Sequence, residues 1–139
     1  MNKIVIYDYE TTNSTIWGSI IEVGAVVVDK NLNELGKFSV RGRMPEGEVP
    51  SAKALLVNST SIDLLTKGNY SHYDLLGAIE NFFSKTSPCM FLGWNNTNFD
   101  RFMTQSNFFK GNRYPYITHS SPNSEHDGIH IARAAQLLN

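Results

Sequence analysis

Residues 4–10 read Ile4-Val5-Ile6-Tyr7-Asp8-Tyr9-Glu10, a β-branched run that ends in two acidic side chains. Such runs are typical of buried strands, and side chains two positions apart on a strand point to the same face. Asp8 and Glu10 are therefore predicted to lie together. Neighbouring carboxylates repel each other unless a cation lies between them, and oxygen ligands favour Mg2+ or Mn2+. The alternative is an acidic pair that ends a strand in solvent, where charges cost little.

The segments that follow predict an α/β domain with a mixed sheet. Residues 20–28 and 35–41 are expected to form strands joined by a hairpin loop at 29–34, which gives an antiparallel opening unit. Residues 42–50 contain two prolines and two glycines and predict an irregular crossing over the surface. The apolar run at 89–94 predicts another buried strand.

Helices are expected between and after these strands. Ser51 and Ser61 are candidate N-caps of two short helices, and the polar residues 95–98 offer N-caps for a helix that follows the strand at 89–94. A last periodic pattern runs from about Asp127 to Leu138, and the chain stops within it, so the domain is expected to be C-terminally incomplete. Helical spacing in the third and fourth helices places these apolar side chains together: Tyr73, Leu76, Ile79, Phe82 and Phe83, then Phe99, Phe102 and Met103.

Composition favours one folded domain over residues 1–139. Hydrophobic residues make up 41% and charged residues 18% of the chain, and no segment is of low complexity. The start shows no export signal and Cys89 is the only cysteine, so we expect a cytoplasmic protein without an internal disulfide. The net charge of -1 excludes binding to nucleic acid through an overall positive field. Local clusters are the candidates for phosphate contacts: Lys37, Arg41, Arg43 and Lys53, and separately Arg101, Lys110 and Arg113.

A second acidic position completes a recognisable set. Asp100 falls in the first turn of the helix after the buried strand, where complementing the helix dipole is its simplest role. Three segments together, however, resemble successive motifs of the DEDD-superfamily exonucleases, and within that superfamily those of bacterial exonuclease I. The segments are Asp8-Tyr9-Glu10-Thr11-Thr12, Ile21-Glu22-Val23-Gly24-Ala25 and Gly93-Trp94-Asn95-Asn96-Thr97-Asn98-Phe99-Asp100. The ordered set is specific, whereas a lone Asp-x-Glu is not.

This resemblance implies a ribonuclease-H-like mixed sheet flanked by helices and a metal-dependent 3'-to-5' exonuclease that acts on single-stranded DNA ends. By resemblance, Asp8, Glu10 and Asp100 would be the catalytic and metal-binding residues for two Mg2+ or Mn2+ ions. Thr11, Thr12 and Asn96 would contact the substrate. Phe99 and Trp94 are expected in the core, and Asp127, in an Asp-x-x-x-x-Ala-Arg segment, is expected to be structural.

The chain departs from the family in two places. Residues 58–60, Asn-Ser-Thr, replace part of a Thr-Gly-Ile-Thr-Pro segment. The third motif, His-x-x-x-x-Asp or Tyr-x-x-x-Asp, is also missing. Tyr70 and Asp74 have the spacing of its tyrosine form, but they precede Asp100, whereas the family motif follows it. We therefore expect Tyr70 and Asp74 to belong to an ordinary helix start. Five residues after His119, His126 and His130 come Ser124, Ile131 and Ala135. We therefore expect little or no nuclease activity from these 139 residues alone.

Two other functions are compatible with the sequence. A non-catalytic nucleic-acid-binding or interaction module could reuse the fold without the missing motif. An unrelated α/β domain could carry acidic residues at these positions by coincidence. No residue distinguishes DNA from RNA as the partner, since that choice depends on contacts with the 2'-hydroxyl.

Overall fold

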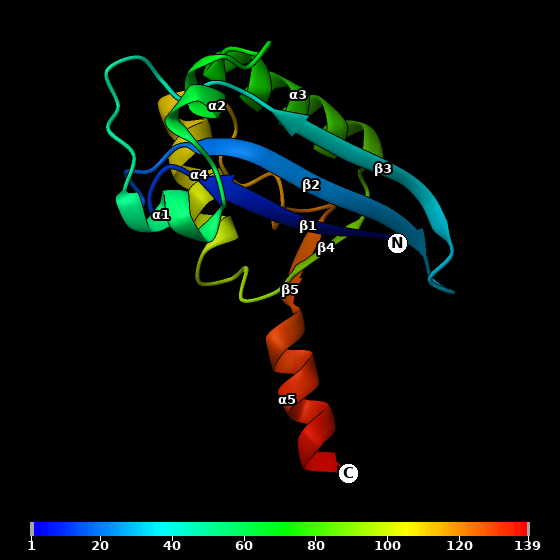
Figure 1. The fold of residues 1–139 in the computed structure, drawn as a ribbon. Helices are drawn as coiled ribbons and strands as arrows, with labels where there is room; N and C mark the ends of the chain where they lie inside the picture. The colour runs from blue at the N-terminus through cyan, green and yellow to red at the C-terminus, as the bar shows by residue number, and fades with distance from the viewer. Residues whose placement is uncertain (1, 139) are drawn as a thin grey trace.

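A computed structural model describes residues 2–138 and shows one five-stranded mixed sheet with strand order β3-β2-β1-β4-β5 (Figure 1). β1 pairs antiparallel with β2, and β2 antiparallel with β3, whereas β4 lies parallel to β1 and β5 parallel to β4. The predicted antiparallel opening followed by parallel strands is therefore confirmed. The strands are β1 (Lys3–Thr11), β2 (Ile20–Asp29), β3 (Glu34–Arg41), β4 (Met90–Gly93) and β5 (Ser124–Asp127).

Helices connect and follow the strands. The predicted caps are confirmed, because the Ser51 and Ser61 hydroxyls accept from the backbone N–H groups of Ala54 and Leu64. Asp74 belongs to the start of α3, where its N–H donates to the Ser71 hydroxyl, as expected for a plain helix start. The helices are α1 (Ala52–Val57), α2 (Ile62–Thr66), α3 (His72–Thr86), α4 (Asp100–Lys110) and α5 (Gly128–Leu138).

One hydrophobic core lies between the sheet and helices α3 and α4. The burial of β1 alternates strictly, so Val5, Tyr7 and Tyr9 face this core. Phe83 of α3 packs edge-on against Phe91 of β4, with ring centroids 4.8 Å apart. Full burial of such side chains stabilises the fold by about 1.5–3 kcal/mol each. The core continues through Leu75, Leu76, Ile79, Met103 and Phe108, with Phe99 packed at its edge.

The opposite face of the sheet carries exposed side chains. Ile6 is 42% exposed, and Asp8 and Gly24 are exposed as well. A broad hollow of about 700 Å³ crosses this face and is lined by Ile6, Asp8, Gly24, Lys37 and Trp94, among others. The even-numbered residues of β1 therefore point into an accessible surface, and Asp8 is one of them.

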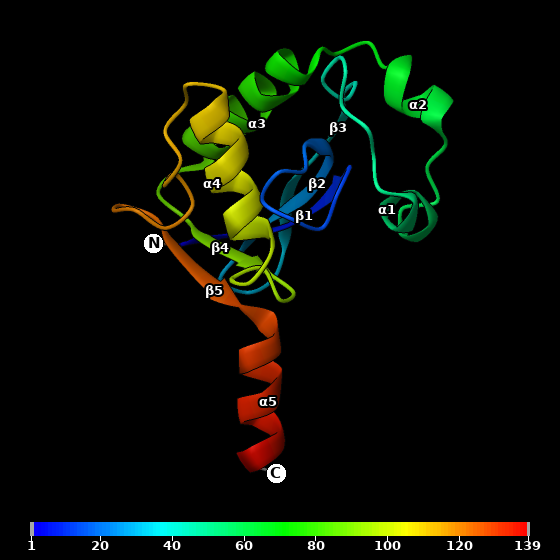
Figure 2. The ribbon, with the colours of Figure 1, turned by 90° about the vertical axis from the view of Figure 1, so that its left-hand side faces the viewer.

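Three details differ from the sequence predictions. β5 was not expected, because its residues Ser-Glu-His-Asp are polar and show no apolar alternation. α4 has Phe99 at its N-cap and no side-chain cap; the Thr97 hydroxyl donates to Asp127 of β5, and the Asn98 amide donates to Asn95. Trp94 is 65% exposed and lies outside the core. The predicted last helix is confirmed as α5, which has no buried residue and extends away from the rest of the chain (Figures 1 and 2).

Among residues 2–138, no helix has both the length and the apolar character that a bilayer crossing requires.

We predict that Gly93→Ala destabilises the fold, because an added Cβ would lie 2.6 Å from the Asn96 Cβ and 3.2 Å from the Tyr7 carbonyl oxygen. Overpacking of this kind costs about 1–3 kcal/mol in the free energy of unfolding. Gly36→Ala is the matched control, since its Cβ would meet nothing within 4 Å. Urea denaturation of both variants measures the difference, and equal losses would contradict the packing described.

Candidate active site

β1 brings the first two predicted acidic residues to the accessible face of the sheet. Asp8 and Glu10 alternate with the buried rings of Tyr7 and Tyr9, so the strand geometry fixes their direction. Glu10 lies opposite Glu22 of β2, whose carboxylate accepts from the Arg41 guanidinium Nε at 2.8 Å. The Arg41 guanidinium near the acidic end of β1 is thus engaged by Glu22.

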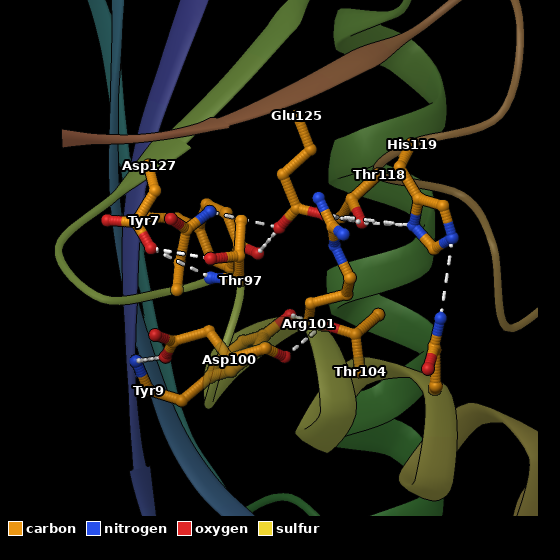
Figure 3. Close-up of polar contacts among 12 residues, drawn as sticks. Tyr7, Tyr9, Thr97, Asp100, Arg101, Thr104, Thr118, His119, Glu125 and Asp127 are labelled. Carbon is orange, nitrogen blue, oxygen red and sulfur yellow. Dashed lines mark hydrogen bonds and ion pairs between the residues drawn. The ribbon is translucent and has the colours of Figure 1, made fainter. Parts of the chain in front are cut away.

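Asp100 reaches the same end of β1 from the first turn of α4. The pairing of β1 with β4 ends at Ile6 and Leu92, and beyond it the Tyr9 backbone N–H donates to Asp100 Oδ1 over 3.2 Å (Figure 3). Tyr9 stands between Asp8 and Glu10 in the chain. The structure therefore brings Asp100 to the segment that carries the other two predicted acids, although they are about 90 positions apart.

Electrostatics at this site favour a bound proton or a bound cation. Burial, followed by the charge of Asp8, raises the pKa of Asp100 to about 7. Partial burial also raises the pKa of Asp8. For Glu10, burial and then the charges of Asp8 and Glu22 raise the pKa, and Arg41 offsets part of this effect. Carboxyl groups whose ionised forms are this disfavoured are frequent at functional sites.

A cavity of about 270 Å³ opens beside Asp8 and Glu10. Its lining includes Asp8, Glu10, Lys53 and Phe99, with the end of α1 forming one wall. Apolar and charged groups therefore converge on one concave surface, as in small-ligand sites.

The acids at this end of β1 do not form a complete set of metal ligands among the described residues. Across residues 2–138, no three His, Cys, Asp or Glu side chains are grouped so that they could hold a metal ion. The Asp8 and Asp100 carboxylates are nevertheless close enough for the charge of one to raise the pKa of the other, and oxygen donors of this type suit Mg2+ or Mn2+. Two carboxylates fit such an ion, and further ligands would have to complete its shell.

The predicted substrate-contact residues are buried and bonded within the protein. The Thr11 hydroxyl donates to the Asn13 carbonyl at 2.9 Å, and the Thr12 hydroxyl donates to Glu48. Asn96 is fully buried and its amide donates to Glu125 at 3.0 Å. Their side chains therefore shape the site from within.

Two acids on β5 support the loop that leads to α4 (Figure 3). Asp127 accepts from the N–H groups of Asn95 and Thr97 at 2.8 and 3.2 Å and from the Thr97 hydroxyl at 2.7 Å, which agrees with the structural role expected for it. Glu125 lies next to it and is fully buried, with the Arg101 guanidinium bonded at 2.7 Å. Sequence reasoning missed Glu125, because an acidic residue in a polar run carries no signal of burial.

Known proteins show the same architecture. No family model matches the chain. The chain is 25% identical over 139 residues to the curated exodeoxyribonuclease I of Buchnera aphidicola subsp. Schizaphis graminum, covering 98% of this chain and 29% of that protein. Escherichia coli exonuclease I in complex with a dA16 oligonucleotide superposes with a TM-score of 0.91 at 22% identity over 100% of this chain and 31% of that one.

This chain has the exonuclease I fold. Another solved structure with that fold, the ExoI/SSB-Ct complex, gives a TM-score of 0.91 at 21% identity and also covers 100% of this chain and 31% of that one. The chain thus spans less than a third of the length of the exonuclease I proteins it matches. The resemblance inferred from the three motifs agrees with both comparisons.

We predict that Asp100→Asn stabilises the metal-free protein at pH 8 and changes little at pH 4. The folded pKa of about 7 lies above the ordinary value of 3.8, so the native state holds a proton that the unfolded state releases, and stability falls as pH rises between these values. This difference in the pKa of Asp100 corresponds to at most about 4 kcal/mol in the free energy of unfolding. The asparagine oxygen can still accept from the Tyr9 N–H.

Urea denaturation at pH 4, 6 and 8 measures this dependence. Asp63→Asn, which alters an exposed pair with Lys67 on α2, is the control and should show no such trend. An Asp100→Asn protein that is no more stable than the parent chain at pH 8 would contradict the prediction.

Proposed function

We propose that this chain forms part of a metal-dependent 3'-to-5' exonuclease that hydrolyses phosphodiester bonds at single-stranded DNA ends. The observation that carries this proposal is the hydrogen bond from the Tyr9 N–H to Asp100, which joins two distant acidic motifs beside the cavity that Asp8 and Glu10 line. The exonuclease I fold supports the same reaction class. Fold alone does not determine chemistry, so the acidic site carries more weight.

The acidic residues would act as oxygen ligands. Asp8 and Asp100 would hold a divalent cation, Mg2+ or Mn2+, and Glu10 would extend the ligand set toward a second one. A bound cation of this kind stabilises charge on a phosphoryl oxygen and lowers the pKa of a water. The hydrogen bond from the Tyr9 N–H fixes the orientation of Asp100, and the buried rings of β1 hold the strand rigid beneath it.

The cavity would receive the terminal nucleotide. Phe99 offers an apolar wall and Lys53 a positive charge for a phosphate, while Thr11 contributes to the lining from a buried position. Thr12 and Asn96 would support this wall from within rather than contact the substrate directly. We propose single-stranded DNA as the substrate because exonuclease I structures of this fold contain single-stranded oligonucleotides.

A second candidate function is a non-catalytic nucleic-acid-binding module. The observation in its favour is that residues 2–138 group no three metal-ligating side chains. Such a module would have no need of a cation between Asp8 and Asp100, so metal binding separates the two functions.

We predict that the chain binds Mn2+ and that Asp8→Ala abolishes this binding, because one of two neighbouring carboxylate ligands is lost. Isothermal titration calorimetry with Mn2+ at pH 8, where Asp100 is ionised, is the measurement. Asp63→Asn removes an exposed carboxylate of α2 and should bind Mn2+ like the parent chain. Equal Mn2+ binding by the parent chain and Asp8→Ala would contradict the proposed ligand set.

We also predict that these 139 residues alone degrade 3'-labelled single-stranded DNA at least about 100-fold more slowly than a complete exonuclease I assayed in parallel with Mn2+. The reason is the missing His-x-x-x-x-Asp motif, which in family members supplies a general base and a further metal ligand. A rate equal to that of the complete enzyme, abolished by Asp8→Ala, would contradict this prediction.

A further inference from the structure

The most unusual polar group outside the proposed ligand set is the buried carboxylate of Glu125. Its side chain is 0% exposed, and each oxygen accepts hydrogen bonds from two other side chains. Oε1 accepts from the Tyr7 hydroxyl at 2.5 Å and from the Asn96 amide at 3.0 Å. Oε2 accepts from Arg101 Nε at 2.7 Å and from the Thr118 hydroxyl at 3.1 Å. Such complete pairing is what permits a charge in the interior.

Two of the four partners of Glu125 belong to the two elements that carry the proposed ligands (Figure 3). Tyr7 immediately precedes Asp8 on β1, and Arg101 immediately follows Asp100 on α4. Asn96 connects them, since its carbonyl accepts from the Arg101 N–H at 2.9 Å. One carboxylate on β5 is therefore bonded to both sides of the acidic site.

Polar contacts between the start of α4 and β1 are few. The Asp100 carboxylate accepts from the Tyr9 N–H, the Thr104 hydroxyl lies 3.0 Å from the Tyr9 hydroxyl and 2.9 Å from the Asp100 carbonyl oxygen, and the helix begins without a side-chain cap. The position of α4 relative to β1 at this end therefore depends on these contacts, on the Glu125 contacts and on the core below. Buried hydrogen-bond networks restrict the positions of their members, so removal of one member is expected to loosen the others.

We infer that Glu125 is a positioning residue, which sets the place of Asp100 relative to Asp8 by bonding Tyr7 and Arg101 at once. This inference rests on the proposed metal-dependent function, because the distance between the two carboxylates matters for a shared cation. Glu125 itself contacts neither the cation nor the substrate. Groups that orient ligands from behind in this way typically change metal affinity about 10- to 100-fold when mutated.

Two variants distinguish positioning from a simple charge effect. Glu125→Gln removes a negative charge and Arg101→Gln removes a positive one, so long-range electrostatics alone would weaken Mn2+ binding in the first and strengthen it in the second. Positioning predicts a weaker Mn2+ affinity in both, by about 10- to 100-fold. Arg101 is 27% exposed, so its variant is expected to fold even if Glu125→Gln does not.

A stability control separates positioning from general destabilisation. Asn123 precedes β5 and accepts from the Ser87 hydroxyl and the Cys89 N–H at 2.9 and 3.1 Å, at the end of β4 away from the acids. Asn123→Ala should lower the melting temperature and leave the Mn2+ dissociation constant unchanged. If this variant weakens Mn2+ binding as much as Arg101→Gln does, the inference is overturned.

A second readout does not depend on metal. The amide proton shift of Tyr9 in 1H–15N NMR spectra reports its hydrogen bond to Asp100, and it should move upfield in Glu125→Gln and Arg101→Gln but not in Asn123→Ala. If the parent chain shows no Mn2+ site that Asp8→Ala removes, the proposed function fails and the Tyr9 shift alone decides the inference. If the parent chain binds Mn2+, unchanged affinity in both variants overturns it.

Discussion

The hydrogen bond between the Tyr9 N–H and the Asp100 carboxylate is the contact on which the candidate site depends. It forms because the β1–β4 pairing ends at Ile6 and Leu92, which leaves the continuing edge of β1 in need of an acceptor. Asp127 holds the loop after β4 through the N–H groups of Asn95 and Thr97, so that α4 begins where Asp100 can supply that acceptor. The hydrogen bond that satisfies the Tyr9 N–H therefore also brings Asp100 to the candidate site.

Ionisation of the buried acid at the candidate site lowers the stability of the fold. Burial and the charge of Asp8 raise the pKa of Asp100 to about 7, so the site near neutral pH holds a carboxylate that a cation would stabilise. The buried Glu125 differs, because four side-chain donors, among them the Arg101 guanidinium, compensate its charge. Asp100 is thus available to a ligand, whereas Glu125 is fully bonded within the protein. Local destabilisation of this kind is common at functional sites.

Sequence reasoning succeeded where local pattern and global fold agree. The alternation in β1 predicted that Asp8 and Glu10 share a face, and the apolar spacing of α3 predicted a helix that packs on the sheet. It failed where long-range contacts decide. β5 forms because its backbone pairs with β4 in a parallel ladder, and the polar sequence Ser-Glu-His-Asp does not predict a strand. The motif that predicts a substrate contact for Asn96 likewise gives no sign of its burial against Gly93 and Glu125, which depends on the packed loop.

The proposed site requires Asp8 and Asp100 to meet closely enough to share one divalent cation. A crystal structure of the chain soaked in Mn2+ at pH 8, with anomalous data collected at the manganese edge, measures this directly. One anomalous peak bonded to carboxylate oxygens of both residues is the expected result. Absence of a peak between them at saturating Mn2+, with the two carboxylates turned apart, would contradict the shared-cation proposal.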